Sequence, residues 1–196
     1  NIEYTIGIKG ANVRDNTTIN NNVTQSANIN IKKSEINAEE NLASNVKTTS
    51  TFKQKIASDG GGFVSKNVAE SNLTVTNNNN FSVDKNSKLY GNKVDIALDS
   101  SNTLESKVDI DVSHFGGRDP EGYSYITLNV NNKLDNKGSI KAGELAQIDL
   151  MKNSRNNLTQ DTKVVVEAAV ATANAGGSLK YNVKNDVNIA KDADIS

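Results

Sequence analysis

The segment Lys137-Gly138-Ser139-Ile140-Lys141-Ala142-Gly143 places one isoleucine among small and charged residues, and similar segments recur along the chain. The counterparts are Lys33-Ser34-Glu35-Ile36-Asn37-Ala38, Asn86-Ser87-Lys88-Leu89-Tyr90-Gly91 and Asp192-Ala193-Asp194-Ile195-Ser196. We call their central apolar residues, which are Ile36, Leu89, Ile140 and Ile195, the apolar anchors. Their positions recur at nearly even intervals, and a sustained period of this length is the sequence signature of a repeat array.

A second set of segments has nearly the same period. In each of them, apolar residues alternate with other residues up to closely spaced glycines, over residues 4–10, 55–61, 111–117 and 171–177. The last glycines of these segments, Gly10, Gly61, Gly117 and Gly177, again recur at similar intervals. Because two independent sets share one period, we interpret the chain as about four repeats of roughly 53 residues that stack as a solenoid.

The local period is two residues almost everywhere. Residues 94–98, 108–112 and 126–130, for example, place Val, Ile or Leu at every second position, which is typical of half-buried strands. The Ala-rich stretch 164–173 could be mistaken for a helix, but its β-branched residues and its place before Gly176 and Gly177 favour a strand. The sequence therefore predicts an all-β protein, most simply a parallel β-helix.

A repeat of roughly 53 residues is longer than one turn of a common three-sided β-helix, whose turns have about 20 to 25 residues. We therefore expect two turns in each repeat and about eight or nine turns in all. With about 4.8 Å between stacked strands, such an array would be a rod roughly 40 Å long.

The composition permits only a narrow core. Of 196 residues, 35% are hydrophobic, 5% are aromatic, 31 are Asn and none is Cys. Low hydrophobicity also favours disorder, but the regular alternation of apolar residues and a net charge of only −1 favour an ordered chain. The Asn excess has two explanations that stay open: hydrogen-bonded ladders between turns, or the codon bias of an AT-rich genome.

Charge and hydropathy exclude several partners. The chain has 22 basic and 23 acidic residues and no basic cluster, which argues against binding to nucleic acid. It also contains no basic amphipathic helix and no apolar run of transmembrane length, so we expect no direct membrane insertion by this segment. Because the sequence begins without Met and both ends fall within the repeat pattern, we expect residues 1–196 to be a single β-helical segment of a larger protein.

Two stretches resemble a known family. Residues 134–145, with their Asn, Gly, Ile and Ala-Gly order, resemble the repeats of filamentous-haemagglutinin-like exoproteins. Residues 173–177, followed by Asn182-Val183 and residues 185–195, resemble more narrowly the leukotoxin-type filamentous adhesins of fusobacteria. The resemblance implies a right-handed parallel β-helix from a large bacterial exoprotein exported by two-partner secretion. It further implies a secreted or outer-membrane-surface location, continuity with further β-helical repeats, and a host cell surface, leukocytes included, as the partner.

No catalytic or metal-binding set is apparent in the sequence. A Ser–His pair would need the single histidine, His114, which lies in an alternating strand pattern and is better explained as a surface residue. Asp109 and Asp111 would share one strand face, with Asp95 and Asp99 on an earlier turn, but a solvated strand face explains them more simply. The glycine clusters lack the nonapeptide cadence of calcium-binding β-rolls. We expect no catalytic residues, no metal site and no cofactor.

A specific contact in a repeat array is expected where the repeat is broken. Residues 118–125 follow the third pair of glycines with the only Pro and two Tyr, which predicts a protruding loop, and we select Arg118, Tyr123 and Tyr125 as candidate partner contacts. An alternative is that the tyrosines pack this loop onto the solenoid.

Three functions therefore stay open. A non-enzymatic stalk that presents a host-contacting surface is favoured, a carbohydrate-active β-helix lyase or hydrolase is the alternative, and a toxin segment acting on leukocyte membranes is the third.

Overall fold

The computed structural model describes residues 2–9, 12–62, 64–114, 119–168 and 172–196, and β-strands are the only regular elements in them. In chain order the strands are β1 (Ile2–Lys9), β2 (Asn12–Ile31), β3 (Glu35–Asn37), β4 (Asn41–Gly62), β5 (Val64–Val83), β6 (Lys88–His114), β7 (Glu121–Asn136), β8 (Ser139–Leu150), β9 (Arg155–Glu167), β10 (Asn174–Ile189) and β11 (Asp194–Ile195). The all-β class is as the sequence predicts.

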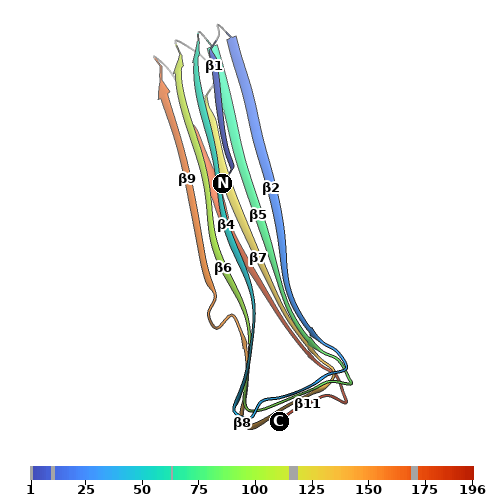
Figure 1. The fold of residues 1–196 in the computed structure, drawn as a ribbon. Coiled ribbons are helices and arrows are strands. Elements are labelled where there is room, and N and C mark those ends of the chain that lie inside the picture. The colour runs from blue at the N-terminus through green and yellow to red at the C-terminus, as the bar shows by residue number, and fades with distance from the viewer. Residues whose placement is uncertain (1, 10–11, 63, 115–118, 169–171) are drawn as a thin grey trace.

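The strands form two parallel sheets. Sheet A has seven strands, in the order β1-β4-β6-β8-β11 with β3 and β9 also paired to β6, and sheet B has the order β10-β7-β5-β2. Figure 1 shows the sheets close together at one end and diverging toward the other, where short segments cross between them. These segments, which we call the base, are β3, the start of β6, the start of β8 and β11. Parallel pairing throughout is compatible with a β-helix.

The chain returns to the same sheet after one sequence period. In sheet B, Asn12 of β2 lies opposite Val64 of β5, and Glu121 of β7 lies opposite Asn174 of β10. Each pairing joins positions that are one full repeat apart, so the expectation of two turns in each repeat is wrong. The reason is strand length: β2, β4 and β6 have 20, 22 and 27 residues, whereas about five or six are usual.

Long strands also change the expected shape. At about 3.3 Å per residue, the 22 residues of β4 span roughly 70 Å, whereas the four stacked strands of sheet B span only about 15 Å. The long dimension of the molecule therefore runs along the strands (Figure 1), not along the stacking direction as the expected rod would have it.

The apolar anchors stack in register at the base, as the sequence predicts. Ile36 lies opposite Leu89, Leu89 opposite Ile140, and Ile140 opposite Ile195. Leu89 and Ile140 are 2% and 0% exposed, which confirms them as inward residues. Ile36 remains 38% exposed because it lies in the first layer and has a stacked neighbour on one side only.

The glycine segments do not all stack together. Gly60 and Gly61 lie in β4 of sheet A, but Gly176 and Gly177 lie in β10 of sheet B, opposite Tyr123 and Ser124. The predicted equivalence of the fourth glycine segment is therefore wrong. A Cβ atom at Gly177 would overlap the carbonyl oxygen of Ser124 and the amide of Gln160, so this glycine permits a close approach of chains.

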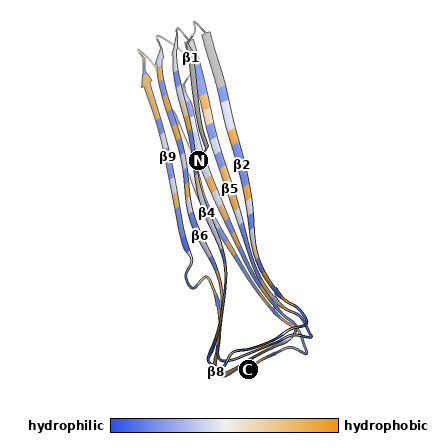
Figure 2. Ribbon diagram, viewed as in Figure 1, coloured by the Kyte–Doolittle hydropathy of each residue, from blue (hydrophilic) through white to orange (hydrophobic). Residues whose placement is uncertain are grey.

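Apolar and polar residues alternate along the long strands (Figure 2), and the inward apolar residues gather in three clusters between the sheets. The largest cluster lies next to the base and contains Phe81, Leu89 and Ile140. The middle cluster is built around Leu104 and Leu128, and the third around Ile56 and Ile110. The core is therefore an interrupted column.

Buried polar side chains separate these clusters, and they hydrogen-bond across the layers. Next to the third cluster, Gln54 Nε2 donates to Ser71 Oγ at 2.7 Å, and the hydroxyls of Ser71 and Ser106 are also 2.7 Å apart. Between the other two clusters, Asn77 donates to Asn102 at 2.8 Å and Asn102 to Asn156 at 2.6 Å. Because these groups are buried, a register shift would leave them unsatisfied.

Candidate functional site

The outer face of sheet B is a ladder of polar side chains. Asn129 Nδ2 donates to Thr76 Oγ1 at 3.3 Å, Asn131 Nδ2 donates to Asn78 Oδ1 at 2.9 Å, and Asn182 Nδ2 donates to Asn129 Oδ1 at 2.8 Å. In each of these bonds the later strand donates to the earlier one. The ladder is thus a regular, flat array in which most side chains bind one another, and a specific contact is expected where it is interrupted.

Tyr123 and Tyr125 interrupt this ladder. They lie on β7 and alternate with the buried residues Gly122 and Ser124, so both rings lie on the outer face. The ring centroids are 6.4 Å apart and the ring planes differ by 14°, which is a stacked pair. The rings lie in register with Glu70 and Asn72 of β5. Together the four side chains form an aromatic platform with polar groups beside it.

The surroundings of Tyr123 hold its ring in place. Tyr123 Oη donates to Glu121 Oε2 at 3.4 Å, and Glu121 Oε1 is 3.1 Å from Lys66 Nζ. On the other side, the ring carbons of Tyr123 lie 3.3 and 3.4 Å from the place where Gly176 would carry a Cβ atom. Partial burial and the negative charge of Glu121 both raise the pKa of Tyr123, so its hydroxyl stays protonated at neutral pH.

The structure corrects part of the sequence-based site. The sequence predicts Tyr123 and Tyr125 in a protruding loop, but β7 begins at Glu121 and contains both of them. The turn residues clustered over 116–122 are the source of this error, because the strand begins inside them. Arg118 lies outside the residues that the structure describes, so the structure brings together two of the three candidate contacts.

A second interruption of the repeat lies on sheet A and was not predicted. Leu98 pairs with Leu150, but only three positions later on β6 Ser101 pairs with Arg155, which is five positions beyond Leu150. The additional residues form a turn between β8 and β9, in which Met151 has a φ of 88°. This φ lies in the left-handed region that favours glycine, so the turn is held by other contacts.

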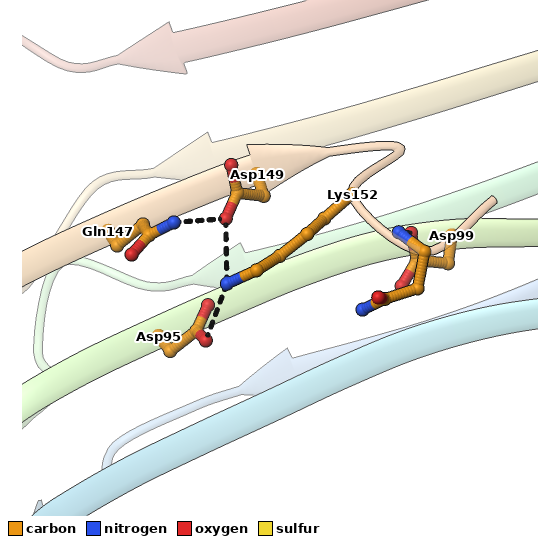
Figure 3. Close-up of polar contacts among 6 residues, drawn as sticks. Asp95, Asp99, Gln147, Asp149 and Lys152 are labelled. Atoms are coloured by element: carbon orange, nitrogen blue, oxygen red, sulfur yellow. Dashed lines mark hydrogen bonds and ion pairs between the residues drawn. The ribbon is translucent and has the colours of Figure 1, made fainter.

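A lysine between carboxylates is one of these contacts. Lys152 Nζ lies 3.2 Å from Asp149 Oδ2 and 3.2 Å from Asp95 Oδ2, as Figure 3 shows, and Gln147 Nε2 donates to Asp149 at 2.6 Å. Hydrogen bonds to Asp149 and Asp95 raise the pKa of Lys152 above its ordinary value. The lysine therefore remains charged and binds the turn to the strand beneath it.

Asp99 is the most buried carboxylate near this turn. It accepts a hydrogen bond from the backbone N–H of Asn153 at 2.8 Å and lies 3.4 Å from Ser154 Oγ, and its exposed fraction is 0%. The turn lies over Asp99 and excludes water from it. Within the described ranges, no group of three or more His, Cys, Asp or Glu residues could hold a metal ion. The contacts of Asp99 and Lys152 hold the turn against β6, which is a structural role.

The other candidate acids do not join this cluster. Asp109 and Asp111 share one face of β6, as predicted, but Asp95 and Asp99 lie on the same strand and not on an earlier turn. About ten residues of extended chain, roughly 33 Å, separate Asp99 from Asp109. This separation exceeds the spacing of paired glycosidase carboxylates, about 5 to 9.5 Å. His114 is the last residue of β6.

A polar groove on sheet B was also missed. It lies on the outer face at the bend near the base and is lined by Asn28, Asn30, Asn80, Phe81, Ser82, Lys133 and Asp135. Its residues on β2, β5 and β7 lie in register with one another, one repeat apart. Assigning one turn to each repeat would have placed them side by side.

Two further findings concern the whole described chain. No helix long and apolar enough to cross a membrane is found among the described residues. Comparison with protein-family models, with curated proteins and with solved structures finds no match.

Proposed function

We propose that this chain is a segment of a large bacterial filamentous adhesin or leukotoxin, secreted or held at the outer-membrane surface. In this proposal it is a right-handed parallel β-helix of about four repeats of roughly 53 residues. It acts without catalysis as a stalk and as a surface that contacts host cells, leukocytes among them. The parallel pairing of all the strands in the described residues supports the β-helical part of the proposal.

The observation that carries the contact function is the stacked pair Tyr123 and Tyr125. The other outward side chains of β7 are amides, hydroxyls and charged groups, and Asn129, Asn131 and Asp135 among them belong to the ladder. Tyrosine offers a large contact area and a hydrogen-bonding group at a low entropic cost, which is why it is enriched at interfaces. Two adjacent rings on a flat sheet, with Glu70 and Asn72 beside them, suit a protein or glycan surface better than a buried small molecule.

The test compares two double variants of the purified chain in a cell-binding assay. Tyr123→Ala/Tyr125→Ala should weaken binding to leukocytes at least about tenfold, since interface tyrosines commonly contribute about 2 kcal/mol or more. Thr127→Ala/Asn129→Ala, on the same face of the same strand, is the matched control and should bind as the unmodified protein does. Adding Arg118→Ala to the tyrosine variant tests the full sequence-based contact set.

Equal binding by a folded tyrosine variant would remove the platform from the contact surface. Failure of the unmodified chain to bind any host cell would reduce the segment to a spacer. Incubation of the chain with host and bacterial glycans, followed by assay of reducing ends and unsaturated products, tests the non-catalytic part of the proposal.

A further inference from the structure

The polar groove on sheet B is a concave site built by three stacked strands. Figure 1 shows that β2, β5 and β7 bend away from sheet A as they approach the base. The polar side chains that line the groove lie on the face of these strands that points away from the core. Its volume is about 330 Å³, within the range of about 300 to 1,000 Å³ that is usual for small-molecule sites. Phe81 is 1% exposed and belongs to the core, so polar groups supply the side chains that a ligand meets.

The amides of β2 offer donors to the groove. Asn80 Nδ2 donates to Asn28 Oδ1 at 2.7 Å, and Ser82 Oγ donates to Asn30 Oδ1 at 2.6 Å. These bonds occupy the oxygen atoms of Asn28 and Asn30. Their amide N–H groups donate to no side chain or backbone atom in the described part of the chain, so they are available to a ligand.

The charges at the groove leave one lysine without an ion pair. Asp135 is paired with Lys137 at 3.3 Å and accepts a hydrogen bond from Asn188 at 2.7 Å. On the next strand, Asp186 lies in register with Lys133 but is paired with Lys184 at 3.0 Å. Lys133 itself forms no ion pair with any described residue. Of the two charged residues that line the groove, Asp135 is thus engaged by Lys137 and Asn188, and Lys133 is the one without an ion pair.

We propose that the polar groove binds a carboxylate-bearing sugar, with Lys133 and the amides of Asn28 and Asn30 as donors to the carboxylate and Asp135 and Asn80 as partners of its hydroxyls. This inference rests on the proposed function, because it names the ligand of one part of the proposed host-contact surface. The site is separate from the tyrosine platform: about eight residues of β7, roughly 26 Å, lie between Tyr125 and Lys133.

The side chains favour this ligand class over others. An apolar ligand would leave the amides, the ammonium group and the carboxylate of the groove without partners, at a cost of about 1 to 3 kcal/mol for each buried group. A simple anion would use Lys133 but not Asp135. A sugar acid presents a carboxylate and several hydroxyls on one rigid ring, and hydroxyls both donate and accept.

The test is calorimetric titration of the intact chain at low ionic strength, because surface charges are screened by salt. The probes are sialyllactose, a disaccharide that ends in glucuronic acid, and lactose as the neutral control. Binding of either acidic sugar in preference to lactose supports the proposal, and the one that binds identifies the source of the carboxylate. Equal binding of lactose, or no binding of either acidic sugar, overturns it.

Three variants locate the site. Lys133→Gln should weaken binding of the acidic sugar by about tenfold or more, since it removes a charge-assisted hydrogen bond. Asn28→Asp keeps the acceptor for Asn80 but replaces a donor by a negative charge, so it should abolish binding without loss of stability. Lys47→Gln, an exposed lysine on sheet A, makes the same charge change as the matched control and should have no effect.

An unchanged affinity in Lys133→Gln places any binding elsewhere and overturns the assignment. The result is distinguishable from a failure of the proposed function. If sugar binding follows these expectations while the chain binds no cells, the proposed contact function is wrong and the groove is still supported as a sugar-binding site. If the chain binds cells and the groove variants change neither cell binding nor sugar binding, only the assignment of the groove is overturned.

Discussion

Asn132 donates a hydrogen bond from Nδ2 to Asn185 Oδ1 at 2.9 Å and accepts one of the same length from Asn79. Asn79 and Asn132 are 0% and 1% exposed, so this ladder lies inside the molecule. Its bonds run from the earlier strand to the later one, opposite to those of the outer ladder. Each face of sheet B therefore has its own row of amides, and both rows fix the same register.

The inner ladder should contribute more to stability than the outer one. Asn132→Ala removes two hydrogen bonds and leaves the buried Asn79 amide without its acceptor, so we expect a loss of about 2 to 3 kcal/mol. Asn131→Ala removes the partly buried bond to Asn78 on the outer face and should cost less, about 1 kcal/mol. Urea denaturation of both variants measures the difference, and equal losses would contradict the distinction between the two ladders.

The apolar anchors should be most sensitive in the middle of their stack. Ile140 is fully buried between Leu89 and Ile195, so Ile140→Ala should cost about 2 to 5 kcal/mol. Ile140→Asp should prevent folding of the base, because it buries an unpaired charge. Ile36→Ala, at a position that is 38% exposed, is the control and should cost clearly less. Unchanged thermal unfolding of Ile140→Asp would refute the placement.

Gly177 should not tolerate a side chain, because a Cβ atom there meets backbone on the neighbouring strand. Gly177→Ala is expected to destabilise by about 2 kcal/mol or more through overpacking. At Gly61 the nearest atom to a new Cβ would be the Ser113 carbonyl oxygen at 3.4 Å, which is ordinary contact. Gly61→Ala should therefore be neutral or stabilise by up to about 1 kcal/mol. Thermal denaturation distinguishes the two outcomes.

Asp84 should make stability depend on acid pH. Its carboxylate accepts a hydrogen bond from Ser87 Oγ at 2.8 Å and from the backbone N–H of Asn86 at 2.9 Å. The Ser87 bond, followed by backbone N–H groups, holds the pKa of Asp84 below its ordinary value of 3.8. The stabilisation is therefore present above about pH 4 and is lost as the pH falls through the lowered pKa.

The measurement is the denaturation midpoint of Asp84→Asn between about pH 6 and pH 2. Its midpoint should fall less with acidification than that of the unmodified protein, because the titrating group is gone. Asp192→Asn is the control, since the Asp192 side chain makes no hydrogen bond to the described residues, and it should keep the original pH dependence. If Asp84→Asn also keeps the original pH dependence, the assignment of the acid sensitivity to Asp84 is contradicted.

The base could be predicted well from the sequence because its anchors are locally distinctive. Ile36, Leu89, Ile140 and Ile195 each stand among charged and small residues, and their register in the structure follows that alignment. The long sides were harder to predict. Alternation with a period of two is the same in sheets A and B, so nothing local shows that Gly177 belongs to a different sheet from Gly61.

The predicted number of turns in each repeat was wrong for a related reason. Strands of about five or six residues are usual, and the expectation of two turns in each repeat assumes strands of that length. Residues 12–31 nevertheless contain neither Gly nor Pro, so the sequence lacked the strongest signals for a corner there. The groove could not be found while each repeat was assigned two turns, because an intervening layer would then separate Asn28, Asn80 and Lys133. They are neighbours only when one repeat is one turn.

A turn as long as the whole sequence period has a consequence for how this chain folds. Each strand pairs with a partner that is synthesised a full turn earlier, so the first pairing must close a loop of that length before any contact between layers forms. The additional entropic cost relative to a turn half as long is only about 0.6 kcal/mol, but almost all of the stabilising pairings are non-local, which slows the first step. Every later turn then has a completed edge as its template. Folding should therefore start slowly at one place and propagate layer by layer.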